Sequence, residues 1–368
     1  ITLNTGSSIT STSGDITLEA NTAGTTTGKF NAISLDNADI ITQSGSINLT
    51  GQGGNTGNVQ YGILLNTGAQ IQSTGFGSVG DIILQGSLGD GAGSTAGGTS
   101  RGTGGVRMAL ASLIQSQSGN IRLQGDTGNS IGRDNVGVKL VGGSQILSLS
   151  TNNSSWVELI GTGGTGTDFN YGVDIREANT KISANQARIT INGVSGNSTS
   201  LNSSSPGVLI LSGSKVESLA TGTNAVKIDI TGQGGSGTGP TLGFVINSNS
   251  TITSIDGSIA IRGESVSTVT GSHGIQLNTG AVTSSRTGNV TLTGIWNQSS
   301  TSQGISTSGT NSLTVNTGSL SLLADAMNLS AVTLQGVGNL TIAPFTPGTT
   351  FTPNLTNIPS GFSSLTLG

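Results

Sequence analysis

The residues that could carry out chemistry are few in this sequence of 368 residues. Cysteine is absent, and histidine occurs once, at His273. A disulfide scaffold, a Cys–His nucleophile and a metal site built from Cys and His are therefore excluded. A Ser–His–Asp triad would have to be assembled around His273. This residue precedes Gly274 and has no obvious acidic partner among its neighbours, so we expect it to be a solvated turn residue.

Charged residues are concentrated in the middle of the chain. If equivalent residues of successive repeats lie side by side, Lys139 is next to Asp174 and Arg122 is next to Glu158. Polysaccharide lyases and hydrolases built on β-helices use two or three carboxylates and a base on such a surface, but no carboxylate pair with the separation for glycoside cleavage is evident. Neighbouring opposite charges favour surface ion pairs, each worth at most about 1 kcal/mol. We therefore interpret these four residues and Arg107 as a structural surface charge ladder.

Three other residues could bind a ligand. Asp168 together with Asp174 could hold calcium, but the nonapeptide repeat of calcium-binding β-rolls is absent. Trp156 and Trp296 could stack on sugars, although Trp296 is far in sequence from a second aromatic residue, and packing is the simpler role for each. The sequence accordingly predicts no catalytic residue, no metal site and no cofactor, and we expect a protein that is not an enzyme.

The amino-acid composition limits the classes of partner that the chain can bind. The chain has 61 glycines, 13 Lys and Arg, 17 Asp and Glu, and a net charge of −4. It therefore offers no basic surface for nucleic acid or for an anionic membrane. No apolar run approaches the ~18 residues that a membrane span requires. Because the chain opens on Ile1-Thr2-Leu3 without a methionine or a signal-peptide pattern, we expect a fragment of a longer protein.

An internal repeat determines the predicted architecture. Two apolar residues separated by one residue, usually followed two positions later by glycine, recur ten times at intervals of 30 to 39 residues, about 34 on average. The ten copies begin at Ile16, Ile47, Ile82, Ile121, Val157, Ile189, Ile228, Ile259, Val290 and Leu320. Each unit contains two further short strand patterns, of the type Gly-Ile-x-Leu and Ile-x-Ser, separated by turns such as Asn4-Thr5-Gly6.

Three short strands per unit cannot enclose a core alone, but they can form one coil of a right-handed parallel β-helix in which each strand pairs with its equivalent in the next coil. We predict an all-β solenoid of about 10 to 11 coils. A β-propeller is the alternative fold, and a four-stranded blade fits three unequal strands less well. Residues 1–324 would form the rod, residues 325–343 a compact final coil, and residues 344–368 a Pro-containing capping or connecting segment, whose Phe345, Phe351 and Phe362 could cover the end.

The variable loops follow the third strand of each unit and should emerge from one edge of the rod. The longest runs from Gly86 to Gly105. Some outward positions of the strands are apolar, so either a loop folds over them or they contact another rod, a neighbouring module or a partner. These candidate lateral or partner contacts are Leu64, Ile83, Leu209 and Val245.

The recurring Gly-Ile-x-Leu, Ile-x-Ser and Gly-x-Ile-x-Leu-x-Gly patterns, with the ending Leu340 to Gly348 and Ile358 to Gly368, resemble filamentous-haemagglutinin-like, two-partner-secreted bacterial exoproteins and their β-strand-repeat relatives. The resemblance is one of pattern and composition over the whole chain. It implies export, an extracellular or cell-surface location, and a role as an adhesin, stalk or fibre.

We therefore expect a structural segment of a secreted or cell-surface adhesin or filament. Its partners would be further copies of itself or adjoining modules of the same chain, with host-cell or matrix glycans as additional candidates, and without nucleic acid or a membrane span. The alternative function is binding or degradation of polysaccharide on the middle coils. Ice binding ranks lower, because charged and apolar residues interrupt the threonine columns of the first and third strands.

Overall fold

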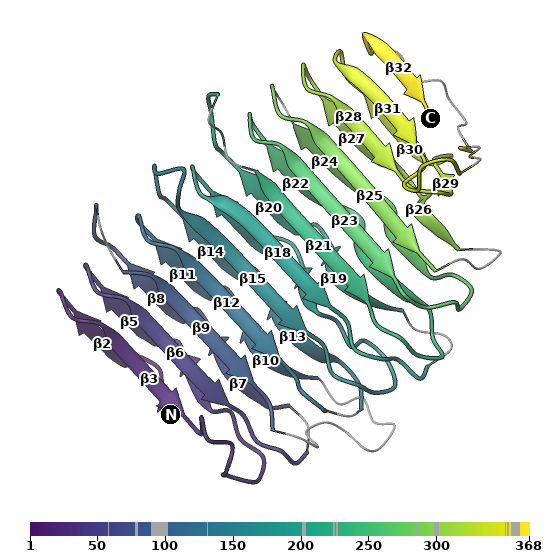
Figure 1. Ribbon diagram of the computed structural model, residues 1–368. Coiled ribbons are helices and arrows are strands. Elements are labelled where there is room, and N and C mark those ends of the chain that lie inside the picture. Colours follow the sequence, from purple (N-terminus) through teal and green to yellow (C-terminus); the bar gives the residue numbers. More distant parts are fainter. Residues whose placement is uncertain are drawn as a thin grey trace.

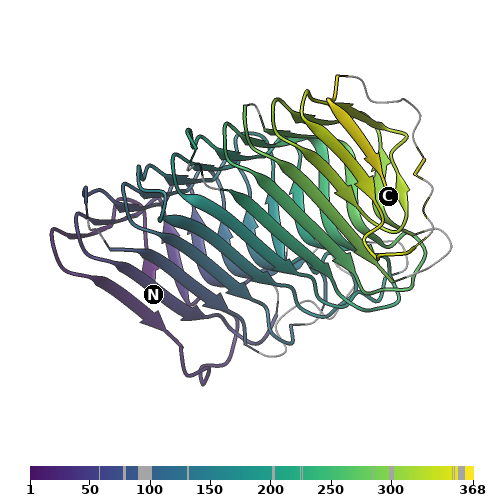
Figure 2. The same cartoon turned by 45° about the horizontal axis from the view of Figure 1, so that its top comes forward.

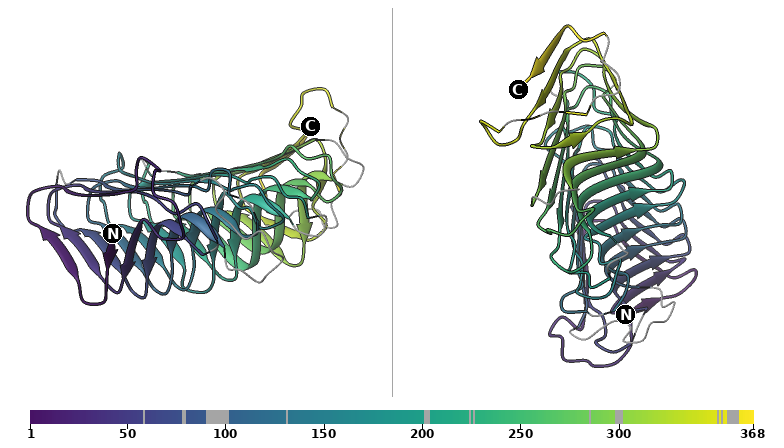
Figure 3. Two further views of the ribbon diagram at one scale, coloured as in Figure 1. Left: turned by 90° about the horizontal axis from the view of Figure 1, so that it is seen from below. Right: turned by 90° about the vertical axis from the view of Figure 1, so that its right-hand side faces the viewer.

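The computed structural model describes residues 1–57, 59–77, 80–89, 102–130, 132–200, 204–223, 225, 227–284, 286–297, 302–349, 351, 353–354 and 361–368. In this part of the chain every regular element is a β-strand, and the strand pairs are parallel. The strands stack along one axis, with the N-terminus at one end and the C-terminus at the other (Figures 1, 2 and 3). The described residues include no helix long and apolar enough to cross a membrane.

Each coil contributes one strand to each of three parallel ladders, which we call the first, second and third ladder. The first ladder consists of β1 (Thr2–Leu3), β4 (Ile33–Asp36), β7 (Tyr61–Asn66), β10 (Thr103–Met108), β13 (Asn135–Leu140), β16 (Val173–Arg176), β19 (Ser205–Leu211), the first halves of β22 (Thr241–Ser254) and β24 (His273–Ser284), β26 (Gln303–Ser308) and β29 (Met327–Asn328).

The second ladder consists of β2 (Ser8–Ser11), β5 (Asp39–Thr42), β8 (Gln70–Ser73), β11 (Leu113–Ser116), β14 (Gln145–Ser148), β17 (Lys181–Ala184), β20 (Lys215–Ser218), the second halves of β22 and β24, β27 (Asn311–Val315) and β30 (Val332–Gln335). The third consists of β3 (Ile16–Ala20), β6 (Ile47–Gln52), β9 (Ile82–Ser87), β12 (Ile121–Asp126), β15 (Trp156–Thr162), β18 (Arg188–Val194), β21 (Ile228–Gly234), β23 (Ile259–Ser265), β25 (Val290–Trp296), β28 (Leu320–Leu323), β31 (Asn339–Ala343) and β32 (Ser364–Leu367).

The predicted solenoid and its repeat are confirmed. Ile47 pairs with Ile82, and Ile82 with Ile121, as neighbours in the third ladder. The ten predicted repeat starts all lie in this ladder, in register. Two shorter steps at the C-terminal end, Leu320 to Leu340 and Leu340 to Leu365, reduce the average repeat to about 32 residues, in the usual range of solenoid repeats. A β-propeller is excluded, because equivalent strands share one sheet.

The core runs along the axis of the rod and consists of stacked aliphatic columns. The two apolar positions of each third-ladder strand point inward, as Ile121 and Leu123 illustrate, and both are fully buried. Period-two alternation explains this, because alternate side chains of a strand point to opposite faces. Each inward residue touches its equivalents in the coils before and after it, so the core is a single cluster that extends from Leu3 to Ile342.

A column of small hydroxyl side chains explains the recurring Ile-x-Ser pattern. Ser73, Ser116, Ser148, Ser218 and Ser254 end strands of the second ladder and are buried, and Ala184 takes the same position in β17. The Ser116 hydroxyl donates a hydrogen bond of 2.9 Å to the backbone oxygen of Gly119, at the turn toward the third ladder. At this corner the buried hydroxyl satisfies a backbone carbonyl, whereas the hydroxyls of Ser73 and Ser148 have no hydrogen-bond partner among the described residues.

The glycine that closes the predicted repeat is required by a close approach of two backbones. In eight successive coils this glycine of the third ladder faces the backbone of the first ladder across the corner of the coil. A Cβ atom at Gly193 would lie 2.1 Å from the backbone oxygen of Gly207. The requirement is steric rather than conformational, since no positive φ is recorded at Gly193.

The C-terminal residues add the last described strands to the stack. Residues 325–343 hold β29, β30 and β31, and the segment 344–368 adds β32, which pairs in parallel with β31. Phe351 and Phe362 pack against the core, as predicted, whereas Phe345 lies outside it. Part of this segment, residues 350, 352 and 355–360, lies outside the described residues, as do residues 90–101 of the Gly86–Gly105 loop.

We expect Gly193→Ala to lower the free energy of unfolding by about 2 kcal/mol, because the new methyl group must displace the Gly207 backbone. Gly14→Ala is the matched control, since its Cβ would meet only Ser11 Oγ, at 3.4 Å. Both substitutions reduce unfolded-chain entropy similarly, so urea unfolding of the two variants isolates the steric effect. Equal unfolding midpoints would contradict the close approach.

Candidate functional site

The loops that follow the third ladder form a second layer over the outer face of the first ladder in the middle coils. They emerge along one edge of the rod, as predicted (Figure 1). They are also stacked in register, because Arg133 forms a parallel bridge with Asp168, and Ser198 bridges both Gly166 and Gly237. The loops therefore continue the solenoid as a short additional ladder rather than standing apart as independent excursions.

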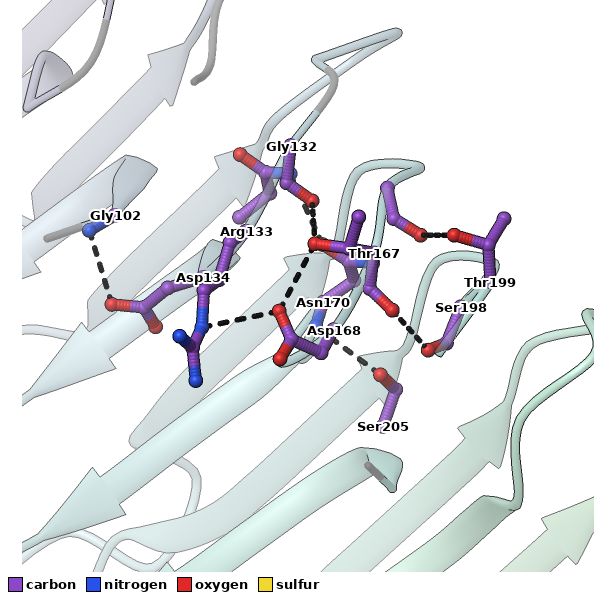
Figure 4. Close-up of polar contacts among 12 residues, drawn as sticks. Gly102, Gly132, Arg133, Asp134, Thr167, Asp168, Asn170, Ser198, Thr199 and Ser205 are labelled. Carbon is purple, nitrogen blue, oxygen red and sulfur yellow. Dashed lines mark hydrogen bonds and ion pairs between the residues drawn. The ribbon is translucent and has the colours of Figure 1, made fainter. Parts of the chain in front are cut away.

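Hydrogen bonds between successive loops hold this layer together (Figure 4). Thr167 N donates to the backbone oxygen of Gly132 at 2.6 Å, and the Ser198 hydroxyl donates to the oxygen of Thr167 at 2.7 Å. Asp134 and Phe169 both have positive φ, 58° in each case. This conformation is costly for Phe169, whereas aspartate adopts it more readily, and the two residues follow the bridged pair Arg133 and Asp168 by one position. The loops thus repeat the same left-handed turn.

Beneath the loop layer lies a network of four charged side chains, which we call the buried charge network: Asp134, Lys139, Asp174 and Arg176. Arg176 binds both carboxylate oxygens of Asp174, through Nε at 2.8 Å and Nη2 at 2.6 Å. Lys139 Nζ lies 2.9 Å from Asp134 Oδ1 and 3.8 Å from Asp174 Oδ2. Asp134 Oδ2 also accepts a hydrogen bond from Gly102 N at 3.1 Å. The network connects the loop layer to the strands of the first ladder.

The structure corrects one member of the predicted surface charge ladder. Lys139 does lie next to Asp174, and Arg107 next to Lys139, but Asp174 is 0% exposed. Its outward position on the strand is covered by the loop layer, which the sequence pattern of the strand does not reveal. Asp174 is therefore the centre of a buried ion-pair network, whose energetics differ from those of exposed pairs.

Burial has opposing effects on the groups of this network. It raises the pKa of the Asp174 carboxyl, against the influence of Arg176 and then Lys139. Burial alone would lower the pKa of Arg176, but the Asp174 carboxylate outweighs it and the pKa of Arg176 is raised. Burial and the nearby Asp174 also raise the pKa of Tyr171. Arg176 and Tyr171 therefore both hold their protons over the whole physiological pH range.

Aromatic rings extend the network toward solvent. The Arg176 guanidinium lies 5.6 Å from the Tyr171 ring centroid, and Tyr171 meets Phe169 edge-on with 5.9 Å between the centroids. Arg133 covers the Phe169 ring at 4.7 Å and pairs with Asp168 at 3.1 Å. Alternating cations and aromatic faces are mutually attractive. Asp168 is thus paired with Arg133, and the described residues contain no group of three His, Asp or Glu side chains placed to hold a metal ion.

Two of the four predicted lateral contacts are enclosed by the loop layer. Leu209 and Val245 are only 7% and 5% exposed and belong to a second apolar cluster, which also contains Val136, Tyr171 and Leu242. For these two residues the structure selects the alternative in which a loop folds over the strand. Leu64 and Ile83 remain half-buried at outward positions, so for them contact with a partner stays a prediction.

Of two further predictions from the sequence, one is confirmed and one is wrong. Arg122 pairs with Glu158 at 3.3 Å on a partly exposed surface, as predicted. His273 is not a solvated turn residue, because it begins β24, is buried, and accepts a hydrogen bond from Gln303 N through Nδ1 at 3.0 Å. Burial lowers the pKa of this imidazole.

Sequence reasoning missed the contributions of Asp134, Tyr171 and Tyr61. The Tyr61 hydroxyl donates to the oxygen of Gly102 at 3.0 Å, and Arg107 lies 5.3 Å from the centre of its ring. These residues lie at the boundaries of loops and strands, where no periodic pattern exists. The chain's few aromatic residues were the available signal, since three of them lie beside arginines in this region. The hydrogen bonds, ion pairs and cation–π contacts of these residues attach the loops to the strands of the first ladder.

We expect Asp174→Asn to lower the free energy of unfolding by about 3 kcal/mol or more, because it leaves buried cations without a counter-charge. Glu158→Gln is the matched control, since it breaks the exposed pair with Arg122 and should cost no more than about 1 kcal/mol. Urea unfolding followed by circular dichroism measures both. Equal losses would show that the network does not secure the loop layer.

The lowered pKa of His273 predicts a specific loss of stability in acid. Below the ordinary histidine pKa of about 6.5 the unfolded chain takes up a proton that the folded chain resists. Stability therefore falls as the pH drops from that value to the folded-state pKa, by up to about 1.4 kcal/mol per pH unit. His273→Asn keeps an acceptor but cannot titrate. The stability difference between the two proteins should change between pH 7.5 and 5.5, and a constant difference would refute the prediction.

Comparison of the chain with protein-family models, with curated proteins and with solved structures finds no match in any of the three.

Proposed function

We propose that this chain is a rigid structural segment of a secreted or cell-surface bacterial adhesin or filament. The observation that carries the proposal is the unbroken register of the third ladder from β3 to β32. Each coil before that of β32 contributes strands to all three ladders, so a force or a bend at one coil is shared with its neighbours through backbone hydrogen bonds and core contacts. Such a rod is suited to extend or display an attached element.

The polar surface of the rod also agrees with a role as an extended, solvent-exposed segment. Its outward positions are mostly Ser, Thr, Asn, Gln and Gly, while the third ladder carries charge as neighbouring pairs such as Arg122 with Glu158. A polar surface without an excess of positive charge has no strong electrostatic attraction for nucleic acid or anionic membranes. The sequence resemblance to exported bacterial exoproteins agrees with this role and supplies the proposed extracellular location.

The last strand supports assembly through a coil end. Among the described residues β32 pairs only with β31. Leu365 and Leu367 are aligned with the core residues Leu340 and Ile342, but they are 46% and 57% exposed. An open strand edge beside exposed core-type leucines favours the addition of another parallel strand. A further coil, from another copy or from an adjoining module, would bury them.

Electron microscopy and light scattering of the purified chain test this proposal. We expect rods roughly 50 Å long, from the strand spacing, that join end to end as the concentration rises. Leu367→Lys should reduce this association, because a charge at an open edge opposes strand addition. Leu110→Lys is the matched control, since Leu110 is equally exposed but lies at a turn. Rods that stay monomeric at every concentration would contradict the assembly.

A further inference from the structure

We propose that the cavity between Trp296 and Phe345 is a binding site for one or two pyranose rings of a neutral glycan. The cavity has a volume of about 380 Å³, and its lining also includes Asn297, Asp325 and Thr346. This size falls within the range of small-molecule sites. The inference goes beyond the proposed structural role, because a rod can extend and display without binding sugars.

Three successive coils supply the walls of the cavity. Trp296 ends β25, Asp325 follows β28, and Phe345 follows β31. Trp296 and Phe345 are thus two coils apart, a separation of about 10 Å from the strand spacing. Among the described residues only Phe169 and Tyr171 make a ring–ring contact, so the two walls do not stack on each other. The coil of β28 lies between them and contributes Asp325 to the lining, so a sugar ring would lie over this coil with an aromatic side chain on either side.

The wall that carries Phe345 is held in place without a ligand. Asp325 accepts hydrogen bonds from Thr346 N and from the Thr346 hydroxyl, both at 2.7 Å. The Arg262 guanidinium lies 5.8 Å from the centre of the Phe345 ring and itself pairs with Glu264. Phe345 nevertheless remains 40% exposed. A fixed, accessible aromatic ring lowers the entropy cost of binding.

The polar groups of the cavity suit hydroxyl groups. Each oxygen of Asp325 accepts one hydrogen bond and has a further lone pair for a ligand. Asn297 uses its Nδ2 atom to donate to the backbone oxygen of Val266, which leaves its Oδ1 as an acceptor. Trp296 Nε1 is buried and has no acceptor among the described residues, so in this structure the tryptophan contributes the surface of its ring rather than a donor.

A sugar fits these groups better than a cation does. An aromatic wall beside a carboxylate can also hold a quaternary ammonium group. Here the Arg262 guanidinium already lies beside Phe345 and would repel such a ligand. A pyranose presents an apolar C–H face to each ring and hydroxyl groups at its rim, which matches aromatic walls with a few acceptors. Trp296 is far in sequence from every other aromatic residue, but the stacking of the coils places Phe345 in the lining of the same cavity.

Because the chain has only two tryptophans, Trp156→Phe makes Trp296 the sole tryptophan reporter when the indole is excited selectively at its long-wavelength absorption edge. We expect the emission of this variant to change saturably with at least one of cellobiose, lactose, mannobiose and N,N′-diacetylchitobiose. In the otherwise unaltered protein, Trp296→Ala and Phe345→Ala should each weaken binding of that sugar about tenfold or more by calorimetry. Trp156→Ala should leave it unchanged.

Circular dichroism of each variant confirms that the rod is intact, and Trp296→Phe, which keeps an aromatic wall, should retain part of the affinity. The proposal is overturned if no sugar of the panel binds, if binding survives both Trp296→Ala and Phe345→Ala, or if choline changes the emission of Trp296 and the sugars do not. None of these results would affect the rod, whose shape and association are measured separately.

Discussion

Parallel pairing of equivalent residues in successive coils is the constraint on which this structure depends. Ile82 contacts Ile47 on one side and Ile121 on the other, and a slip of one residue would turn each of these side chains toward water. The backbone hydrogen bonds and the core therefore enforce the same register. The glycine corners add a steric condition, because only the absence of a Cβ allows the third ladder to pass the first so closely.

The same register organises the polar parts of the molecule. Lys139 and Asp174 are neighbours because their strands pair, and Asp174 is buried because the loops of successive coils also stack. A buried carboxylate requires compensation, which Arg176 provides through two contacts. Arginine suits this place because its planar fork matches a carboxylate in two-point contact. The charge network is therefore a consequence of the loop layer, and it secures that layer in return.

Rigidity and recognition can coexist in such a rod. Stacked coils present residues at fixed spacings, so side chains far apart in sequence become neighbours without a flexible domain. The wall formed by Trp296 and Phe345 depends on this, as does the apolar cluster around Leu209. In both places, side chains from neighbouring coils together form a group that no single coil contains. A long array of similar coils can thus gain individual sites by substitution at a few outward positions.

The sequence by itself determined the all-β class, the solenoid, the register of the third ladder and the neighbours along each outward column, because strand period and repeat spacing are local, periodic signals. It did not determine which outward positions are covered. Asp174, Leu209 and His273 lie on strands whose patterns point them outward or to a corner, and yet all three are buried. Only the tertiary structure decided this, because the covering loops have no period, and their course depends on contacts with coils that are distant in sequence.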